Sequence, residues 1–177
     1  MKKLNQRRWQ NFKNNRKAYF SLWIFGACFL ISLFAEFVAN DKPIILNYKN
    51  SYYFPIFNFY SEKDFGGEFN SEAEYRTIEV QCLIKTSGNR QCLDKPNIIL
   101  AQTQESENRL NGWIIWPLIR SSFNTINYDV KIAPSPPDKN HLLGTDDQTR
   151  DVVARIIYGF RISTLFAFLV TIISSSI

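Results

Sequence analysis

The sequence has few of the residues that most enzymes and metal proteins depend on. It contains one histidine, His141, and three cysteines among 177 residues. It has no Walker-type phosphate loop, no dinucleotide fingerprint, no nucleophile elbow and no zinc-ligand spacing. With a single histidine, general acid–base chemistry would rest on carboxylates, and no carboxylate pair stands beside an inferred apolar pocket. We therefore expect no enzymatic activity, no cofactor and no bound metal.

Acidic residues are missing from the start of the chain, where the first is Glu36. Seven basic residues stand in the first 17 positions: Lys2, Lys3, Arg7, Arg8, Lys13, Arg16 and Lys17. A nucleic-acid-binding tail has a similar charge. The apolar run that follows at once favours the cytoplasmic flank of a membrane helix instead, because insertion retains Lys and Arg on that side. We predict a basic cytoplasmic N-terminus at residues 1–18 and no nucleic-acid partner.

Residues 19–39 form a long apolar run that contains one charge, Glu36. A helix of this length crosses about 30 Å of hydrocarbon. Tyr19 and Trp23 supply amphipathic rings for the cytoplasmic boundary. A cleaved signal peptide is the alternative, but the run is longer than a signal core and ends in no small-x-small cleavage site. The sequence thus predicts an uncleaved transmembrane helix at 19–39 in the inner membrane.

The cysteines fall into two settings. Cys28 lies within the apolar run, where it acts as a small hydrophobic residue. Cys82 and Cys92 flank a Ser-Gly-Asn-Arg turn signal, so a hairpin there would bring the sulfurs within bridging range. A disulfide follows if this region lies outside the cytoplasm, and two unpaired thiols remain the alternative.

Residues 40–143 mix basic and acidic side chains with short apolar pieces, which is typical of a soluble surface. We expect a periplasmic segment here, with short strands or extended packing at 52–60 and further short strands at 79–84 and 97–101. The aromatic residues of 52–60 could stack on a sugar or base, although burial is their commoner fate. The proline-rich residues 133–137 predict an extended connector.

Residues 144–160 predict an amphipathic interfacial helix. Thr145 and Gln148 have capping-box spacing, and Asp146 adds negative charge at the expected N-terminus. Asp151 and Arg155 are spaced as an i,i+4 ion pair opposite an apolar stripe. The chain is apolar again from residue 162 to 177. As a helix this run is about 24 Å long, which is short of a full span. We assign residues 161–177 to it. We read them as the start of a truncated second transmembrane helix.

Several strings resemble the permease subunits of bacterial peptide ABC importers, in the dipeptide/oligopeptide permease family. They are RRWQNFKNNRKAYFSLWIF with ANDKP (39–43), NGWIIWPLIR (111–120) and APSPP (133–137) with LGTDDQTRDVVARIIYGFRIS (143–163). The ANDKP and NGW pieces are similar to the Yej-type branch. The resemblance does not extend over about 79–107. Family members usually carry Gly where this chain has Thr149.

The resemblance implies an α-helical membrane protein of six or so transmembrane helices, with a small mixed α+β extracytoplasmic segment between the first two. It implies a second permease subunit, two cytoplasmic ATPase subunits and a periplasmic peptide-binding protein as partners. Oligopeptides, including microcin C-like peptides, are the implied substrates, and the ATPase-coupling loop would lie beyond Ile177. The motif residues would shape the helix near the substrate entrance, and they are Gly144, Thr145, Asp146, Arg150, Asp151, Arg155, Gly159 and Arg161.

A protein of another class fits the composition as well. A single-span anchored periplasmic scaffold or binding module would bury residues 162–177 as the last helix of its own core.

Overall fold

The computed structural model describes residues 2–105 and 112–176, so Asn111 of the NGW motif lies outside the described residues. The chain forms two compact units. We call Met1–Ala35 with Ile156–Ile177 the helical unit, and Glu36–Arg155 the central unit.

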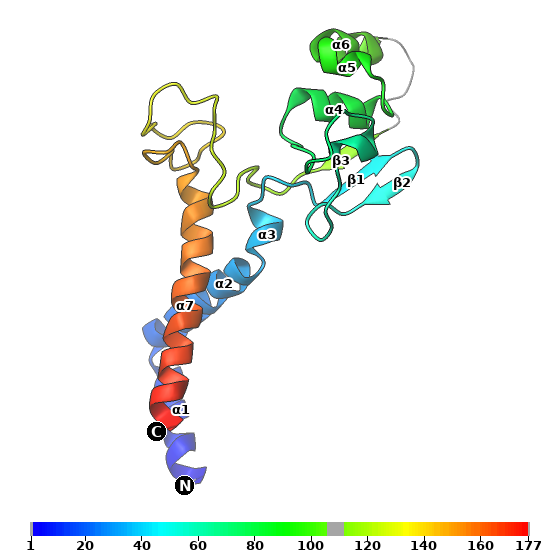
Figure 1. Cartoon of the computed structure of the whole chain (residues 1–177). Coiled ribbons are helices and arrows are strands. Elements are labelled where there is room, and N and C mark those ends of the chain that lie inside the picture. Colours follow the sequence, from blue (N-terminus) through cyan, green and yellow to red (C-terminus); the bar gives the residue numbers. More distant parts are fainter. Residues whose placement is uncertain (1, 106–111, 177) are drawn as a thin grey trace. The chain divides into compact units, whose positions relative to one another are not determined.

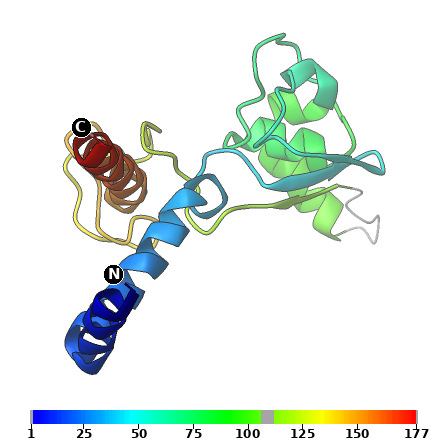
Figure 2. The same cartoon turned by 90° about the horizontal axis from the view of Figure 1, so that it is seen from below.

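The helical unit starts with α1 (Lys2–Asn14) and α2 (Arg16–Leu33). Asn15 separates them and caps α2, because its side-chain oxygen accepts a hydrogen bond from the Ala18 N–H at 3.3 Å. The third helix is α7 (Val152–Ser176), which Figures 1 and 2 both show as one unbroken helix. Edge-to-face ring pairs join α2 to α7, with centroids 5.5 Å apart for Phe25 and Phe160 and 5.7 Å apart for Phe29 and Phe168.

Both α2 and α7 are long and apolar enough to cross a membrane. Their 18 and 25 residues give lengths of about 27 and 37 Å. Most of their large apolar side chains are exposed, as expected of helices that cross a membrane.

The first span differs from the predicted 19–39. Helix α2 starts at Arg16 and stops at Leu33, and a separate short helix, α3 (Ala35–Val38), follows. The break has a local cause. The Ser32 hydroxyl donates to the Phe29 carbonyl at 2.7 Å, and the Phe34 N–H donates to Ile31 three residues back, which tightens the last turn.

The central unit is built on a three-stranded antiparallel sheet of order β2-β1-β3. Its strands are β1 (Ile45–Tyr48), β2 (Ser51–Tyr53) and β3 (Trp113–Ile115). Lys49 and Asn50 both have positive φ, 49° and 63°, as a two-residue hairpin turn of the primed type requires. Leu46 on the middle strand pairs with Tyr53 on one side and Ile114 on the other.

Helices cover this sheet, which corrects two predictions. The segments predicted as strands at 79–84 and 97–101 are helical, within α4 (Ile78–Lys85) and α6 (Pro96–Glu105). The 3₁₀ helix η1 (Glu62–Phe65) and α5 (Gln91–Asp94) complete the set. Figure 1 shows α4 between the sheet and the pair α5 and α6. The β-branched residues of α4 supply a buried helix face here, which short apolar runs do not distinguish from a strand.

The main core lies between the sheet and α4. Its buried members are Leu46, Tyr48, Phe65, Ala73, Tyr75, Val80 and Ile84. Tyr75 and Phe65 are the largest fully buried side chains, and their rings meet edge to face with centroids 5.9 Å apart. Part of the 52–60 aromatic cluster joins this core through Tyr53 and Tyr60, whereas Phe57 and Phe59 are exposed. Tyr52 and Phe54 are exposed as well, so burial, the commoner fate, holds for two of the six aromatic residues of 52–60.

From residue 116 to α7 the chain has no helix or strand among the described residues. The backbone is held by scattered hydrogen bonds, including a parallel bridge between Ala39 and Ile119 and an antiparallel bridge between Thr145 and Asp151. This irregular segment contains most of the motif residues that the sequence singles out.

Candidate functional site

The centre of the motif region is the carboxylate of Asp146. Its Oδ1 accepts hydrogen bonds from the backbone N–H groups of Gln148 and Arg150, each at 2.9 Å. Its Oδ2 accepts from Nε of Arg150 at 2.9 Å, with Nη2 of the same guanidinium also at 2.9 Å, and from Nη1 of Arg155. One acidic group thus binds two backbone amides and two arginines. We call Asp146, Arg150 and Arg155 the Asp146 cluster.

The protonation of Asp146 follows from these contacts. Burial by itself raises the pKa of this carboxyl, since it disfavours the charged form. The hydrogen bonds from the backbones of Arg150 and Gln148, and the guanidinium of Arg150, outweigh burial and bring the pKa of Asp146 below its ordinary value. The carboxylate therefore stays charged at neutral pH, as the paired arginines require.

Gly144 and Thr145 join the motif to the Pro-rich connector. Gly144 has φ +74°, and a Cβ placed there would collide with the backbone carbonyl of Ser135. Thr145 shares a hydroxyl–hydroxyl hydrogen bond of 2.9 Å with Ser135 and accepts another from the Ser135 N–H at 3.2 Å. Glycine is needed because the two backbones approach so closely at this point.

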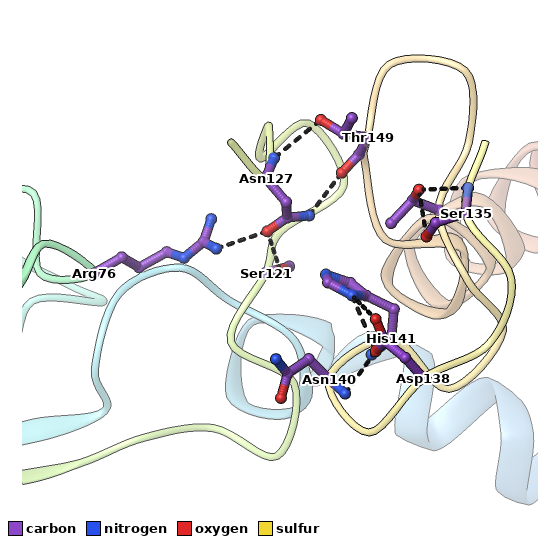
Figure 3. A network of polar contacts seen from close by, with 9 residues as sticks. Arg76, Ser121, Asn127, Ser135, Asp138, Asn140, His141 and Thr149 are labelled. Atoms are coloured by element: carbon purple, nitrogen blue, oxygen red, sulfur yellow. Dashed lines mark hydrogen bonds and ion pairs between the residues drawn. The ribbon is translucent and has the colours of Figure 1, made fainter. Parts of the chain in front are cut away.

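Thr149 stands at a position where members of the permease family usually have glycine. The backbone conformation of Thr149 explains this preference for glycine. Its φ is +59°, the left-handed region that glycine adopts without strain and a β-branched residue adopts rarely. Two hydrogen bonds offset the strain. Asn127 donates from its backbone N–H to the Thr149 hydroxyl at 3.2 Å and from its side-chain amide to the Thr149 carbonyl at 2.7 Å (Figure 3). The turn therefore keeps the glycine-like conformation despite the substitution.

The predicted helix start at residue 144 is wrong by eight residues. Residues 144–151 form a turn, and α7 begins at Val152. The N-cap is Asp151, whose Oδ1 accepts from the Ala154 N–H at 2.9 Å. Thr145 and Gln148 do not form a capping box, because the Thr145 hydroxyl bonds Ser135 and the Gln148 N–H bonds Asp146.

Two further predictions about this helix are also wrong. There is no separate interfacial helix at 144–160, because α7 runs without a break from Val152 to Ser176. The expected i,i+4 pair between Asp151 and Arg155 does not form. Asp151 caps the helix, and Arg155 pairs with Asp146 instead.

Removal of the Asp151 cap is expected to loosen the first turn of α7. The Asp151→Ala variant leaves the Ala154 N–H without its acceptor, at a cost of about 1 to 2 kcal/mol. Amide hydrogen exchange at residues 152–155 should accelerate by about tenfold, since 1.4 kcal/mol corresponds to that factor. Asp151→Asn keeps a side-chain oxygen in the same place and should exchange close to the wild-type rate. If the amides of residues 152–155 exchange as slowly in the alanine variant as in the wild type, Asp151 does not cap α7.

The last two motif residues, Gly159 and Arg161, belong to the helical unit. A Cβ at Gly159 would meet no atom within 4 Å, so close packing within the described residues does not require glycine there. The Arg161 guanidinium lies over the Tyr158 ring at 5.1 Å from its centroid.

Sequence reasoning missed a polar network that leads to the motif turn. Arg76 Nη2 donates to Oδ1 of the buried Asn127 at 2.6 Å, and the Ser121 hydroxyl lies 3.4 Å from the same oxygen (Figure 3). Through Thr149 this network reaches the turn that holds the Asp146 cluster. The partners are 51 and 22 positions apart, and no local spacing signals such pairs.

Cys82 and Cys92 are joined by a disulfide, with Cα atoms 5.6 Å apart. The predicted hairpin is absent, and the bridge links α4 to α5 instead. Both cysteines are fully buried. Among the described residues, no three His, Cys, Asp or Glu side chains come together as a metal-binding group.

Comparison with known proteins identifies the family. Residues 3–56 match the N-terminal transmembrane domain of oligopeptide transport permease C. The chain is 42% identical over 173 residues to the inner membrane ABC transporter permease protein YejE of Escherichia coli K12, covering 97% of the chain and 44% of that protein. It is 38% identical over 195 residues to the peptidoglycan transport system permease protein YejE of Agrobacterium fabrum, covering 96% of the chain and 45% of that protein.

The chain thus spans a little under half the length of these curated relatives. No solved structure matches it significantly. The apolar helices α2 and α7 agree with the membrane placement of the relatives. With both relatives matching nearly the whole chain, it belongs to the YejE-type ABC transporter permeases and is an inner-membrane protein.

Proposed function

We propose that the chain acts in an ABC importer of oligopeptides, as part of the permease subunit that forms the membrane pathway. The observation that carries this proposal is the match of nearly the whole chain to YejE-type permeases. The two span-length helices on either side of a folded unit support it, because an anchored scaffold needs only one span.

The proposed topology places the basic N-terminus in the cytoplasm and residues 40–143 in the periplasm. The charge asymmetry supports it, since seven basic residues precede α2 or occupy its first turn and no acid stands before Glu36. The Cys82–Cys92 disulfide also supports it, because such bridges persist in the oxidising periplasm. On this topology the Asp146 cluster fixes the backbone where the chain enters its second span.

The proposed partners are a second permease subunit, two cytoplasmic ATPase subunits and a periplasmic peptide-binding protein. One relative is named for peptidoglycan transport, and the matching domain is named for oligopeptide transport. We propose peptides as the shared substrate chemistry, with microcin C-like peptides as a special case.

The test is peptide uptake in cells. Deletion of the coding sequence should abolish accumulation of a radiolabelled tripeptide. Expression of the wild-type sequence in the deletion strain should restore accumulation. A restored Asp146→Asn variant should give reduced uptake, whereas Asp147→Asn should give wild-type uptake. Unchanged accumulation in the deletion strain would refute the proposed function.

The topology predicts a clear reporter pattern. Alkaline phosphatase fused after Leu100 should be active, because the enzyme matures only outside the cytoplasm, and a fusion after Phe12 should be silent. A silent fusion at Leu100 with an active one at Phe12 would reverse the topology. Equal expression of both fusions, checked by immunoblot, is the control.

A further inference from the structure

A small cleft in the central unit contains two arginines that form no ion pair with any carboxylate of the described residues. It has a volume of about 230 Å³, and its lining includes Arg76, Trp116, Arg120, Asn127, Asp129 and His141. We call it the arginine cleft.

Arg76 is held in place by a neutral partner. Its Nη2 donates to Oδ1 of Asn127 at 2.6 Å. Asn127 is 1% exposed, and its amide nitrogen donates to the Thr149 carbonyl, which fixes the amide with its oxygen towards Arg76. A guanidinium has five N–H donors, and this bond uses one of them. No carboxylate of the described residues lies within ion-pair distance of Arg76.

Arg120 is placed by an aromatic ring. Its guanidinium lies over the Trp116 ring, 5.1 Å from the centroid. It too has no carboxylate at ion-pair distance within the part of the chain that the structure describes. Stacking on the ring leaves the edge donors of the guanidinium available to a ligand.

The other groups at the cleft are consistent with an anionic ligand. His141 is 8% exposed and its Nδ1 faces Asp138 at 3.2 Å, so that carboxylate is already engaged. Asp129 is the one acid in the lining, and its exposed side chain is screened by solvent. By contrast, the cations of the Asp146 cluster and Lys42 are paired with carboxylates.

We infer that the arginine cleft binds the C-terminal carboxylate of a peptide, an inference that rests on the proposed function. A guanidinium fork matches the two oxygens of a carboxylate. The volume is below the roughly 300 Å³ at which pockets for whole drug-sized ligands begin, so the cleft suits an end group and not an extended chain.

The test is calorimetric titration of the full chain in nanodiscs of neutral phosphatidylcholine. The probes are trialanine with a free carboxylate, trialanine amide and inorganic phosphate. The free acid should bind at least about tenfold more tightly than the amide, since a charged hydrogen bond contributes about 1.5 to 3 kcal/mol. The exposed Arg120 can be changed without risk to the core, and Arg120→Gln should remove that difference.

Arg90→Gln is the matched control, because Arg90 is exposed and lies outside the cleft. It should keep the preference for the acid. Arg76→Gln should weaken acid binding, with hydrogen exchange as the check that the variant is folded. Equal binding of acid and amide overturns the inference, as does Arg120→Gln with full discrimination. Phosphate that binds more tightly than trialanine overturns the assignment to a peptide carboxylate.

The two proposals fail separately. Tighter binding of the acid than of the amide, with no peptide uptake in cells, would refute the proposed importer function but not the proposed carboxylate site. Peptide uptake that depends on the chain, with equal binding of acid and amide, would refute only the proposed carboxylate site in the arginine cleft.

Discussion

Replacement of Asp146 by asparagine is expected to accelerate amide hydrogen exchange across residues 146–152 by about 30-fold or more. The carboxylate accepts two backbone hydrogen bonds and pairs with Arg150 and Arg155. Loss of charged hydrogen bonds costs about 1.5 to 3 kcal/mol, and 2 kcal/mol corresponds to that change in rate. Asparagine keeps one acceptor oxygen but turns an amide N–H towards a guanidinium. Both arginines then lose their counter-charge.

The matched control is Asp147→Asn. Asp147 is the next residue, exposed, and no hydrogen bond or ion pair joins its carboxylate to the described residues. The same change of charge should leave exchange of the turn within a factor of about two, as for surface substitutions generally. Equal acceleration in the two variants would mean that net charge, and not the Asp146 contacts, holds the turn.

The same contacts set a pH dependence. The folded-state pKa of Asp146 is lowered, so its stabilising contribution is fully present above the unfolded value of about 3.9. Protection of the turn should fall as the pH drops through the lower folded-state pKa. The Asp146→Asn variant should lack this acid transition.

The apolar spans and the position of the motif could be predicted from the sequence because both depend on local composition. A long run with few charges favours a membrane helix, and helices α2 and α7 lie close to where the runs indicate. The boundary at Leu33 could not be predicted, because it depends on one serine hydroxyl that bonds a carbonyl of the preceding turn.

The use of each motif residue could not be predicted, because one pattern fits two structures. Thr145 with Gln148, and an aspartate between them, fits both a capped helix start and a turn closed by the aspartate side chain. Which of the two structures forms depends on two residues. The Ser135 hydroxyl forms a hydrogen bond with the Thr145 hydroxyl, and the Asn127 side chain stabilises the left-handed backbone of Thr149. Both partners are remote in sequence, so local reasoning assigns the wrong start to α7.

The mixed α+β character of the central unit could be predicted, but its element types could not be assigned throughout. Residues 79–84 are rich in apolar and β-branched side chains and lie in α4, where tertiary packing outweighs intrinsic preference. The turn at 87–90 places Cys82 and Cys92 close together whether helices or strands flank it. The sequence therefore predicts correctly that the two cysteines lie close together, although it assigns the wrong secondary structure to the segments that carry them.

Removal of the Cys82–Cys92 disulfide is expected to lower the melting temperature of the central unit by on the order of 10 °C. The cysteines are 10 positions apart, and closing a loop of this size contributes about 2.5 to 3 kcal/mol by limiting the unfolded chain. The cluster around the bridge is small, with Leu83 as its other fully buried member, so little apolar packing remains to hold α5 and α6 on α4.

The double variant Cys82→Ala and Cys92→Ala removes the bridge without burying a new polar group. Thermal unfolding in detergent, followed by circular dichroism, should show the drop, and a reductant should reproduce it in the wild-type chain. Cys28→Ala is the matched control, because Cys28 is the free cysteine, exposed on α2, and should leave the melting temperature unchanged. An unchanged melting temperature in the double variant would show that packing alone holds the three helices together.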